Sequence, residues 1–353
     1  MAYKNTSDKA PVGVIGAGSF GTAVANLLAE NGEVLFYSRR PDAVEQINKE
    51  RINNGQAIHK NITATADLNE IADRCYLLFP SVPSDSFRQL MRDASPHLRP
   101  DHILIHCTKG FDIKLEEGKT ILDKDLILFP SDIYTMSKVI LEETTVRRVG
   151  CMSGPNLARE IADFHPAATV IASKFEEVIK EGETAIRSKR LQVYSNNDIY
   201  AVELAGVLKN SMALAAGALG GLGYGNNAMA FLITRGLGEI IRLSTAMGAD
   251  KHAFLGLAGI GDLVATCTSP LSRNYTVGAR LAKGETLEQI IATSSEVAEG
   301  IKTVSISKKL ADSTDIKLPI IQAIYRVLFE DLKVEDALGY LMEYRFGYDA
   351  DYM

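Results

Sequence analysis

Cysteine and paired metal ligands are scarce in this chain of 353 residues. Its four cysteines, Cys75, Cys107, Cys151 and Cys267, lie far apart and form no CxxC pair. Such usage favours reduced thiols in a cytosol over a disulfide framework or a zinc site, so we expect a cytoplasmic protein. The six histidines show no HExxH or other ligand spacing, and we therefore expect no bound metal.

Long apolar runs and a surplus of positive charge are also missing. No stretch reaches the roughly 18 uninterrupted apolar residues of a membrane span, and the longest bland run, 213–223, is broken by Gly217, Gly220 and Gly221. The first residues lack a basic region followed by an apolar run, so no signal peptide is expected. The net charge of −6 argues against a nucleic-acid partner.

The length and the order of the sequence patterns predict two domains of different class. Up to about Asn197, short β-branched runs alternate with helix-like segments such as 20–29, 85–94 and 175–187. The strand candidates are PVGVIG, EVLFYS, YLLFPSV, HILIHCT, VGCMSG, ATVIAS and LQVYS. This alternation predicts a mostly parallel sheet with helices on both faces.

After Asn197 the strand signals stop and long helical patterns follow, at 199–216, 227–247, 304–311, 319–330 and 334–344. We therefore predict an α/β protein with a Rossmann-like dinucleotide-binding domain over 1–195. An all-α domain that binds substrate and carries catalysis is expected over 196–353.

A glycine-rich turn joins the first predicted strand to a helix. Gly16, Gly18 and Gly21 have GxGxxG spacing in GAGSFG, with a strand before them and a helix after. In this context the glycines allow a tight turn, close approach of a pyrophosphate, and packing of helix on strand. The helix N-terminus adds N–H groups and a positive dipole end. The alternative is a glycine turn that binds nothing.

The second predicted strand ends in Ser38, Arg39 and Arg40 rather than in an acidic residue. An acid at this position would hold the ribose hydroxyls of NAD, whereas arginine suits a 2′-phosphate. We therefore expect NADP(H) to bind, with NAD(H) possible. Alternatively, the arginines only solvate a loop.

Lys209 is the one charged residue in LAGVLKNSMALAAG. On a helix its neighbours three and four positions away are Gly206, Ala205, Met212 and Ala213, none of which can pair with an ammonium. Asp262 also lies in an apolar stretch, four residues before Thr266, and is a candidate partner. A lysine in such a setting could exchange a proton with a carbonyl or hydroxyl oxygen. The alternative for Asp262 is to cap a helix that begins at Leu263.

Two further stretches before residue 160 carry polar groups at strand ends. Lys109 follows HILIHC at the sheet edge where α/β proteins bind ligands, or is an exposed loop lysine. Gly154, Pro155 and Asn156 form a turn whose N–H groups could hold an anion, or merely cap a helix.

The later half of the chain supplies two more candidates. Ser272, Arg273 and Asn274 combine groups that suit a bound phosphate, or form a polar surface turn. Glu299 precedes a helix, where it could serve a ligand or simply favour the helix dipole.

Together these stretches resemble the bacterial-type, NAD(P)-dependent glycerol-3-phosphate dehydrogenase family. The resemblance rests on GAGSFGTA, TKG, SGPNLARE, VELAGVLKNSMALAAG, GLGYGNNAMAFLITRGL, FLGLAGIGDLVATCTSPLSRN and VAEG, in the family's order from residue 14 to about 303. It implies reversible conversion of dihydroxyacetone phosphate to sn-glycerol 3-phosphate for phospholipid synthesis, in a homodimer. Phe20 and Asn156 depart from the family pattern, where Trp and a small hydroxyl residue are usual.

The same resemblance assigns roles to individual residues. Lys209 looks like the proton donor and acceptor, with partners that come from across the domain cleft. The expected substrate contacts are Lys109, Gly154, Asn156, Lys209, Asp262, Ser272, Arg273 and Asn274. The expected cofactor contacts, with the glycines of the loop, are Gly16, Gly18, Ser19, Phe20, Gly21, Arg39, Arg40, Lys109, Ala158, Arg273, Val297 and Glu299.

Two other functions remain open from the residues. A hydroxy-acid or ketopantoate-type reductase would share the two-domain plan but would need a carboxylate site in place of a phosphate site. A protein that senses NADPH without turnover would need the glycine loop but not Lys209 with Asp262. Fold alone cannot decide among the three.

Overall fold

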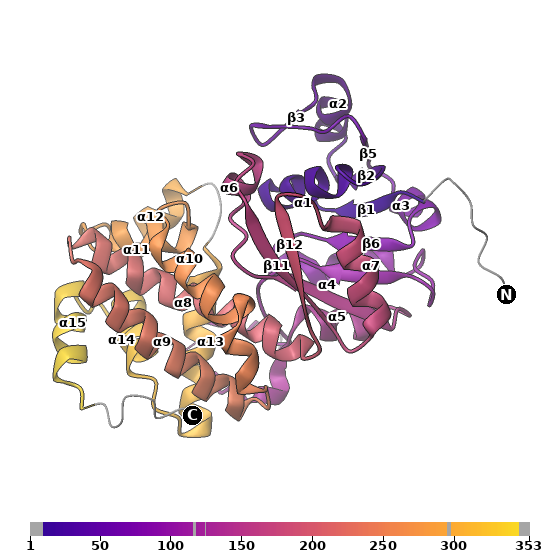
Figure 1. Ribbon diagram of the computed structural model, residues 1–353. Coiled ribbons are helices and arrows are strands. Elements are labelled where there is room, and N and C mark those ends of the chain that lie inside the picture. Colours follow the sequence, from indigo (N-terminus) through magenta and orange to yellow (C-terminus); the bar gives the residue numbers. More distant parts are fainter. Residues whose placement is uncertain (1–9, 116–117, 124, 295–297, 346–353) are drawn as a thin grey trace. The chain divides into compact units, whose positions relative to one another are not determined.

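The computed structural model describes residues 10–115, 118–123, 125–294 and 298–345 (Figure 1). The chain forms two units. The first contains the residues up to Lys109 together with Met136–Ile199, and the second contains Gly110–Thr135 together with the residues from Tyr200 onward. These units differ from the sequence-based ranges 1–195 and 196–353 mainly in the segment 110–135.

One eight-stranded sheet forms the first unit, in the order β12-β11-β10-β7-β6-β1-β2-β5. Its strands are β1 (Val12–Ile15), β2 (Val34–Tyr37), β5 (Ile62–Thr65), β6 (Leu77–Pro80), β7 (Ile103–His106), β10 (Arg148–Ser153), β11 (Ala167–Ser173) and β12 (Leu191–Asn196). Neighbours pair in parallel, except that β10 and β11 are antiparallel. The mostly parallel sheet is therefore confirmed, and only the edge strand β5 was not predicted among the eight.

The strand order reverses at β1. From β1 the chain runs to β2 and β5 on one side, and then returns to β6 on the other side. Ligands of such sheets bind at the carboxyl ends of the strands beside this reversal, and the glycine loop after β1 lies there. The helices are α1 (Ser19–Ala29), α2 (Pro41–Glu50), α3 (Leu68–Arg74), α4 (Ser84–Ala94), α5 (Met136–Glu143), α6 (Ala158–Ala162) and α7 (Glu176–Ile186).

Right-handed crossovers on either side of the reversal place the helices on opposite faces of the sheet. Accordingly, α1 packs with α6 and α7, whereas α4 packs with α3 and α5. The core between the layers is aliphatic and aromatic, with Val14, Phe36 and Phe79 fully buried. A small hairpin of β3 (Ile52–Asn53) and β4 (Gln56–Ala57) follows α2.

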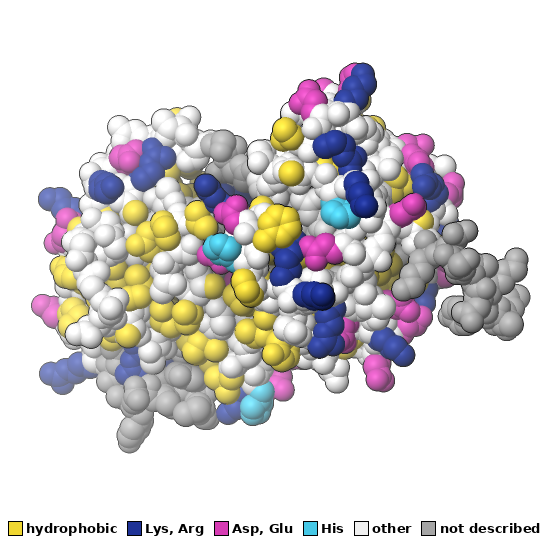
Figure 2. All heavy atoms as spheres, turned by 45° about the horizontal axis from the view of Figure 1, so that its top comes forward, with side chains coloured by type: hydrophobic (Ala, Val, Ile, Leu, Met, Phe, Trp, Pro, Cys, Tyr) yellow, Lys and Arg dark blue, Asp and Glu magenta, His cyan; other side chains and the backbone are white. Residues whose placement is uncertain are grey.

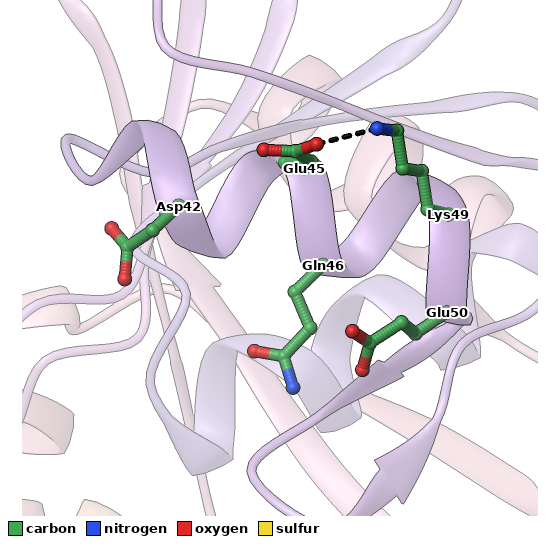
Figure 3. Close-up of a pocket in the computed structure, with 5 residues that line it drawn as sticks. All are labelled: Asp42, Glu45, Gln46, Lys49 and Glu50. Carbon is green, nitrogen blue, oxygen red and sulfur yellow. Dashed lines mark hydrogen bonds and ion pairs between the residues drawn. The ribbon is translucent and has the colours of Figure 1, made fainter.

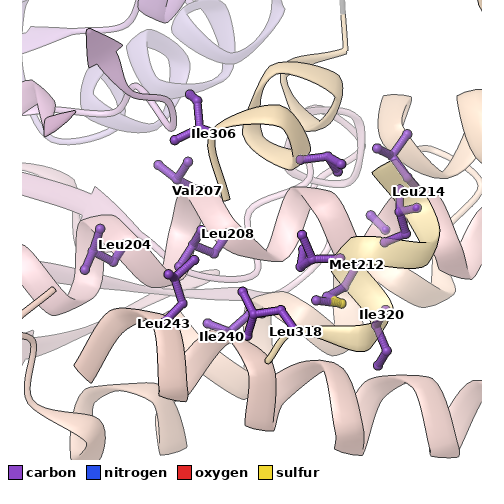
Figure 4. Packing of buried hydrophobic residues seen from close by; sticks show 14 of the residues in the cluster. Leu204, Val207, Leu208, Met212, Leu214, Ile240, Leu243, Ile306, Leu318 and Ile320 are labelled. Atoms are coloured by element: carbon purple, nitrogen blue, oxygen red, sulfur yellow. The ribbon is translucent and has the colours of Figure 1, made fainter. Parts of the chain in front are cut away.

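The second unit is helical. Its helices are α8 (Ile199–Gly221), α9 (Asn226–Ala246), α10 (Asp262–Thr268), α11 (Arg273–Leu281), α12 (Leu287–Thr293), α13 (Glu299–Thr314), α14 (Pro319–Phe329) and α15 (Val334–Glu343), with the short turns η2 (Lys251–Leu255) and η3 (Leu257–Gly261). Figure 4 shows Leu208 and Met212 of α8 among buried side chains of α9, such as Ile240. An aliphatic core thus surrounds α8.

Helix α8 is long and apolar enough to cross a membrane by length and composition alone, although 89% of its most apolar window is buried inside the protein. This burial among the other helices accounts for the apolar composition without a membrane, because a helix that is hydrophobic all round suits a protein core as well.

Glycines let α11 contact the backbone of α8. A Cβ at Gly217 would lie 1.8 Å from the carbonyl oxygen of Tyr275, and one at Gly278 would lie 1.9 Å from that of Leu214. No side chain fits at either position, so these glycines serve close packing. The contact fixes the start of α11 relative to α8.

The segment 110–135 joins the helical unit because its apolar residues are buried there. It holds the strands β8 (Asp112–Ile113) and β9 (Ile133–Tyr134) and the turn η1 (Pro130–Asp132). Phe111 and Leu128 belong to the core of the second unit. From α13, the buried Lys309 donates to the carbonyl oxygens of Asp123 and Leu126 at 2.6 and 3.3 Å. The sequence patterns placed this segment in the first domain.

A buried carboxylate caps α14 from another helix. Glu239 of α9 is 1% exposed, and its two oxygens accept from the backbone N–H groups of Ile320 and Ile321 at 2.6 and 3.0 Å. Burial raises the pKa of Glu239 to about 8, because desolvation outweighs these two hydrogen bonds. The folded protein therefore favours the protonated acid.

We expect the free energy of unfolding to fall as the pH rises from the ordinary value of 4.5 toward the folded pKa of about 8, because the folded state binds the additional proton in that range. Glu239→Gln removes this titration, so its stability relative to the wild type should improve with rising pH. Urea unfolding between these limits measures the difference. The exposed Glu335→Gln is the control, and parallel curves for Glu239→Gln and the wild type would contradict the expectation.

Candidate active site

The glycine loop has the geometry that a dinucleotide requires. Gly16 has a φ of +118°, and a Cβ there would lie 2.5 Å from the carbonyl oxygen of Ser81. At Gly21 a Cβ would lie 1.9 Å from the carbonyl oxygen of Gly16. At Gly18, by contrast, no described atom outside the adjoining residues lies within 4 Å of the Cβ position. Two glycines therefore close the turn, and the third leaves open space at the N-terminus of α1, where a pyrophosphate fits.

The other predicted cofactor residues of the first unit lie on several elements. Ser19 begins α1 and is exposed, whereas Phe20 is half-buried against the core of the unit. Arg39 and Arg40 follow β2 and are exposed, with Ser38 buried beneath them. Ala158 begins α6 and packs on the same core. The two arginines are accessible to a ligand phosphate at the end of β2.

Lys109, Gly154 and Asn156 lie together at the ends of β7 and β10. Lys109 Nζ donates to the carbonyl oxygen of Gly154 at 3.1 Å, and Gly154 has a φ of +131°. Asn156 Nδ2 donates to Thr169 Oγ1 at 2.9 Å. The Oδ1 atom of Asn156 is buried without a hydrogen-bond partner among the described residues. This cluster offers both a cation and an unsatisfied acceptor.

Lys209 lies in a buried polar cluster of the second unit. Its Nζ atom is 2.6 Å from Asp262 Oδ1 and also donates to Thr266 Oγ1, while the Thr266 hydroxyl donates to the backbone oxygen of Asp262 at 2.6 Å. Lys209 is 7% exposed and Asp262 2%. The pairing of Lys209 with Asp262 is thus confirmed.

The partners that the structure gives Lys209 lie on α10 of the same unit. Partners from across a domain cleft stay a prediction. Asp262 is the first residue of α10 and the N-cap is Gly261, so Asp262 is not the N-cap of a helix that begins at Leu263. The carboxylate of Asp262 instead contacts the ammonium of Lys209.

Ser272, Arg273 and Asn274 open α11. Ser272 is the buried N-cap, and its hydroxyl accepts from the N–H of Tyr275 at 3.4 Å. Arg273 is exposed, and Asn274 Oδ1 accepts from the N–H of Gly300 at 2.9 Å. Glu299, half-buried, begins α13 beside Gly300. The amide of Asn274 thus ties the start of α13 to the start of α11.

Two contacts of these clusters were not predicted from the sequence. Thr266, whose spacing of four from Asp262 was noted, also completes the environment of Lys209. Gly300 contacts Asn274, and a Cβ there would lie 2.6 Å from the carbonyl oxygen of Asn210 on α8. Val297, predicted as a cofactor contact, lies outside the described residues.

A pocket on the first unit is lined by none of the predicted site residues. This pocket, beside α2, is lined by Asp42, Glu45, Gln46, Lys49 and Glu50 (Figure 3). Glu45 and Lys49 form an ion pair there at 2.5 Å. In the described part of the chain, no three His, Cys, Asp or Glu side chains are grouped to hold a metal.

Comparisons with known proteins cover both units. The sequence model of the NAD-dependent glycerol-3-phosphate dehydrogenase N-terminus matches residues 11–179, and that of the C-terminus matches 198–339. The chain is 40% identical to a glycerol-3-phosphate dehydrogenase (NAD(P)+) of Saccharophagus degradans, over 99% of this chain and 95% of that protein. A Teredinibacter turnerae protein of the same name is 39% identical over 96% of each chain.

Solved structures agree. A glycerol-3-phosphate dehydrogenase from Coxiella burnetii superposes with a TM-score of 0.83 and 32% identity, over 95% of this chain and 99% of that chain. A PanE/ApbA family ketopantoate reductase from Ralstonia eutropha superposes with a TM-score of 0.56 at 14% identity, over 93% of this chain and 99% of that chain. The latter likeness concerns the fold alone.

We expect Asp262→Ala to destabilise the protein by about 3–5 kcal/mol, because it leaves the buried ammonium of Lys209 without its carboxylate. The double variant Lys209→Met/Asp262→Leu should recover most of this loss by filling the site with apolar groups. Chemical denaturation of the single and double variants measures both effects.

The matched control is Asp312→Ala, which breaks the ion pair with Lys308 at a carboxylate that is 60% exposed. Its expected cost is below about 1 kcal/mol. Equal losses for Asp262→Ala and Asp312→Ala would show that burial of the Lys209 pair has no energetic consequence.

Proposed function

Because the chain belongs to the NAD-dependent glycerol-3-phosphate dehydrogenase family, we propose that it reversibly reduces dihydroxyacetone phosphate to sn-glycerol 3-phosphate with NAD(P)H. The observation that carries this proposal is the buried cluster of Lys209, Asp262 and Thr266, which places an amine beside a carboxylate and a hydroxyl, away from the surface. The product would supply phospholipid synthesis.

The first unit would bind the cofactor. The open position at Gly18 and the N-terminus of α1 suit its pyrophosphate. The exposed Arg39 and Arg40 suit the 2′-phosphate of NADP(H), with NAD(H) as a possible second cofactor. When bound, the nicotinamide supplies or accepts the hydride. The further expected cofactor contacts are Ser19, Phe20, Lys109, Ala158, Arg273, Val297 and Glu299.

Lys209 would hold and move the proton of the reaction. In reduction, a hydride adds to the carbonyl carbon and the ammonium gives its proton to the carbonyl oxygen, so that an alcohol forms. In oxidation, the neutral amine takes the hydroxyl proton back. Asp262 favours the charged ammonium before transfer, and Thr266 accepts from Nζ and so fixes its direction.

The remaining polar residues would bind the substrate. Arg273 offers a planar fork of donors to a phosphate, beside the hydroxyl of Ser272 and the amide of Asn274. The first-unit group of Lys109, Gly154 and Asn156 would contribute a cation and polar contacts. These roles follow from the chemistry of each group.

We also infer a cytoplasmic homodimer. Figure 2 shows hydrophobic side chains spread over the visible face of the second unit. In that unit Ile260 and Val264 are four residues apart and are 38% and 41% exposed, so they could meet a second copy. Light scattering of the purified chain that gave a monomer mass at micromolar concentration would refute the dimer.

Purified protein should oxidise NADPH with dihydroxyacetone phosphate but not with dihydroxyacetone, because the unphosphorylated ketone lacks the anion that Arg273 would bind. Lys209→Met should lower kcat/KM by about 10²- to 10⁴-fold through loss of the proton donor. Absorbance at the nicotinamide band follows the reaction. Turnover of ketopantoate in place of the phosphorylated ketone would replace the proposed substrate, and unaltered turnover by Lys209→Met would reject its role.

Arg39→Ala should raise the KM for NADPH by about tenfold, because one charged hydrogen bond to the 2′-phosphate is lost. The KM for NADH, which lacks that phosphate, should change little. Arg159→Ala removes an exposed arginine of the same unit and is the matched control. An equal rise in the KM for NADPH and for NADH would show that Arg39 does not bind the 2′-phosphate.

A further inference from the structure

A short hairpin, not predicted from the sequence, lies against the glycine loop. Its strands β3 and β4 pair Ile52 with Ala57 and Asn53 with Gln56. The turn between them is Asn54-Gly55, with φ of 48° and 74°, as two-residue hairpin turns of this composition require. Asn26 of α1 donates to the carbonyl oxygen of Ala57 at 2.8 Å. The hairpin is therefore attached to the helix that follows the glycine loop.

Three side-chain amides of this hairpin donate to carbonyl oxygens of the loop. Asn53 Nδ2 and Asn54 Nδ2 both reach Ala17, at 3.0 and 2.9 Å. Gln56 Nε2 reaches Ser19 at 3.1 Å. Asn53 Nδ2 also lies 2.8 Å from Thr22 Oγ1. Residues that flank Gly18 on both sides are thus held by the same hairpin.

The remaining carbonyl of this stretch is also engaged. The backbone oxygen of Gly18 accepts from the N–H and the hydroxyl of Thr22, at 2.9 and 2.8 Å. Three consecutive peptide oxygens therefore have protein donors. The N–H groups of the first turn of a helix, in contrast, have no partner within the helix.

The planarity of the peptide bond converts these contacts into an orientation. In a trans peptide the C=O and the next N–H point in opposite directions. Holding the oxygen of Ala17 on the hairpin turns the N–H of Gly18 away from it, and holding the oxygen of Ser19 does the same for the N–H of Phe20. These N–H groups lie at the N-terminus of α1, which is where an anion binds to a helix.

We propose that Asn54 and Gln56 are positioning residues for the dinucleotide. They hold the carbonyls of Ala17 and Ser19 so that the N–H groups of Gly18 and Phe20 face the pyrophosphate before it arrives. The inference rests on the proposed function for the identity of the ligand, but it concerns binding and not turnover. Donors that already have the right orientation bind an anion more tightly, because binding then costs no conformational entropy of the loop.

The test is the double variant Asn54→Gly/Gln56→Ala. Glycine accepts the left-handed backbone at position 54, so the amides of Asn54 and Gln56 are removed without strain there, and the Ala17 oxygen keeps only the buried Asn53 as a hairpin donor. We expect the Kd of NADPH, from nicotinamide fluorescence, to rise about tenfold, while kcat changes by less than about twofold. The inhibition constant of adenosine 2′-monophosphate, which lacks the pyrophosphate, should stay unchanged.

Asn31→Ala is the matched control, since this exposed asparagine also donates to backbone oxygens of the first unit, those of Ala185 and Arg187, each at 2.9 Å. It should leave the Kd of NADPH unaltered. An unchanged Kd in the double variant, or parallel losses for NADPH, adenosine 2′-monophosphate and thermal stability, would overturn the inference. A wild type that binds NADPH without reducing dihydroxyacetone phosphate would reject only the proposed function, and one that binds no NADPH would reject both.

Discussion

The ion pair between Lys209 and Asp262 is the constraint on which the second unit depends. A charge in an apolar helix is tolerated only when a partner reaches it, so α10 must lie against α8 at this point. Glycines then bring two further helices to backbone distance of α8, Gly278 on α11 and Gly300 on α13. The polar residues that begin α11 and α13 are thereby fixed relative to the ammonium. The need to pair the buried Lys209 thus constrains where the neighbouring helices lie around α8.

In the first unit the corresponding constraint is the peptide chain of the glycine loop. The three glycines have different tasks, since Gly16 and Gly21 meet backbone oxygens and only Gly18 leaves space. Glycines alone do not fix the orientation of the loop, however, because a glycine residue can adopt more backbone conformations than other residues. The amides of the β3–β4 hairpin and Thr22 compensate by holding the carbonyl side of the loop. Flexibility needed for close approach is therefore countered by hydrogen bonds on the opposite side.

The features that the sequence predicted are those with a local signal. Seven strands show as short apolar runs, the glycine loop shows through its strand–turn–helix context, and Lys209 and Asp262 show as charges without neighbours. The edge strand β5, with the weak pattern ITAT, carried too little apolar character to be recognised. The position of 110–135 depends on where Phe111 is buried, which is a property of the tertiary structure. Which helix carries the partner of Lys209 is also a property of the tertiary structure. The sequence indicates that this lysine needs a partner, but it does not indicate which element supplies one.

Burial alone does not mark a functional charge, as a comparison of Lys309 with Lys209, both buried in the second unit, demonstrates. Lys309 donates to the backbone oxygens of Asp123 and Leu126, and burial lowers the pKa of this amine. Its contacts tie the segment 110–135 to α13, and backbone oxygens cannot take up a proton in exchange. Lys209 instead meets a carboxylate and a hydroxyl, both of which can adjust as its charge changes. The difference in partners separates a lysine that holds the chain together from one suited to transfer a proton. By the same criterion Glu239, which is bonded to two backbone N–H groups, is a structural residue.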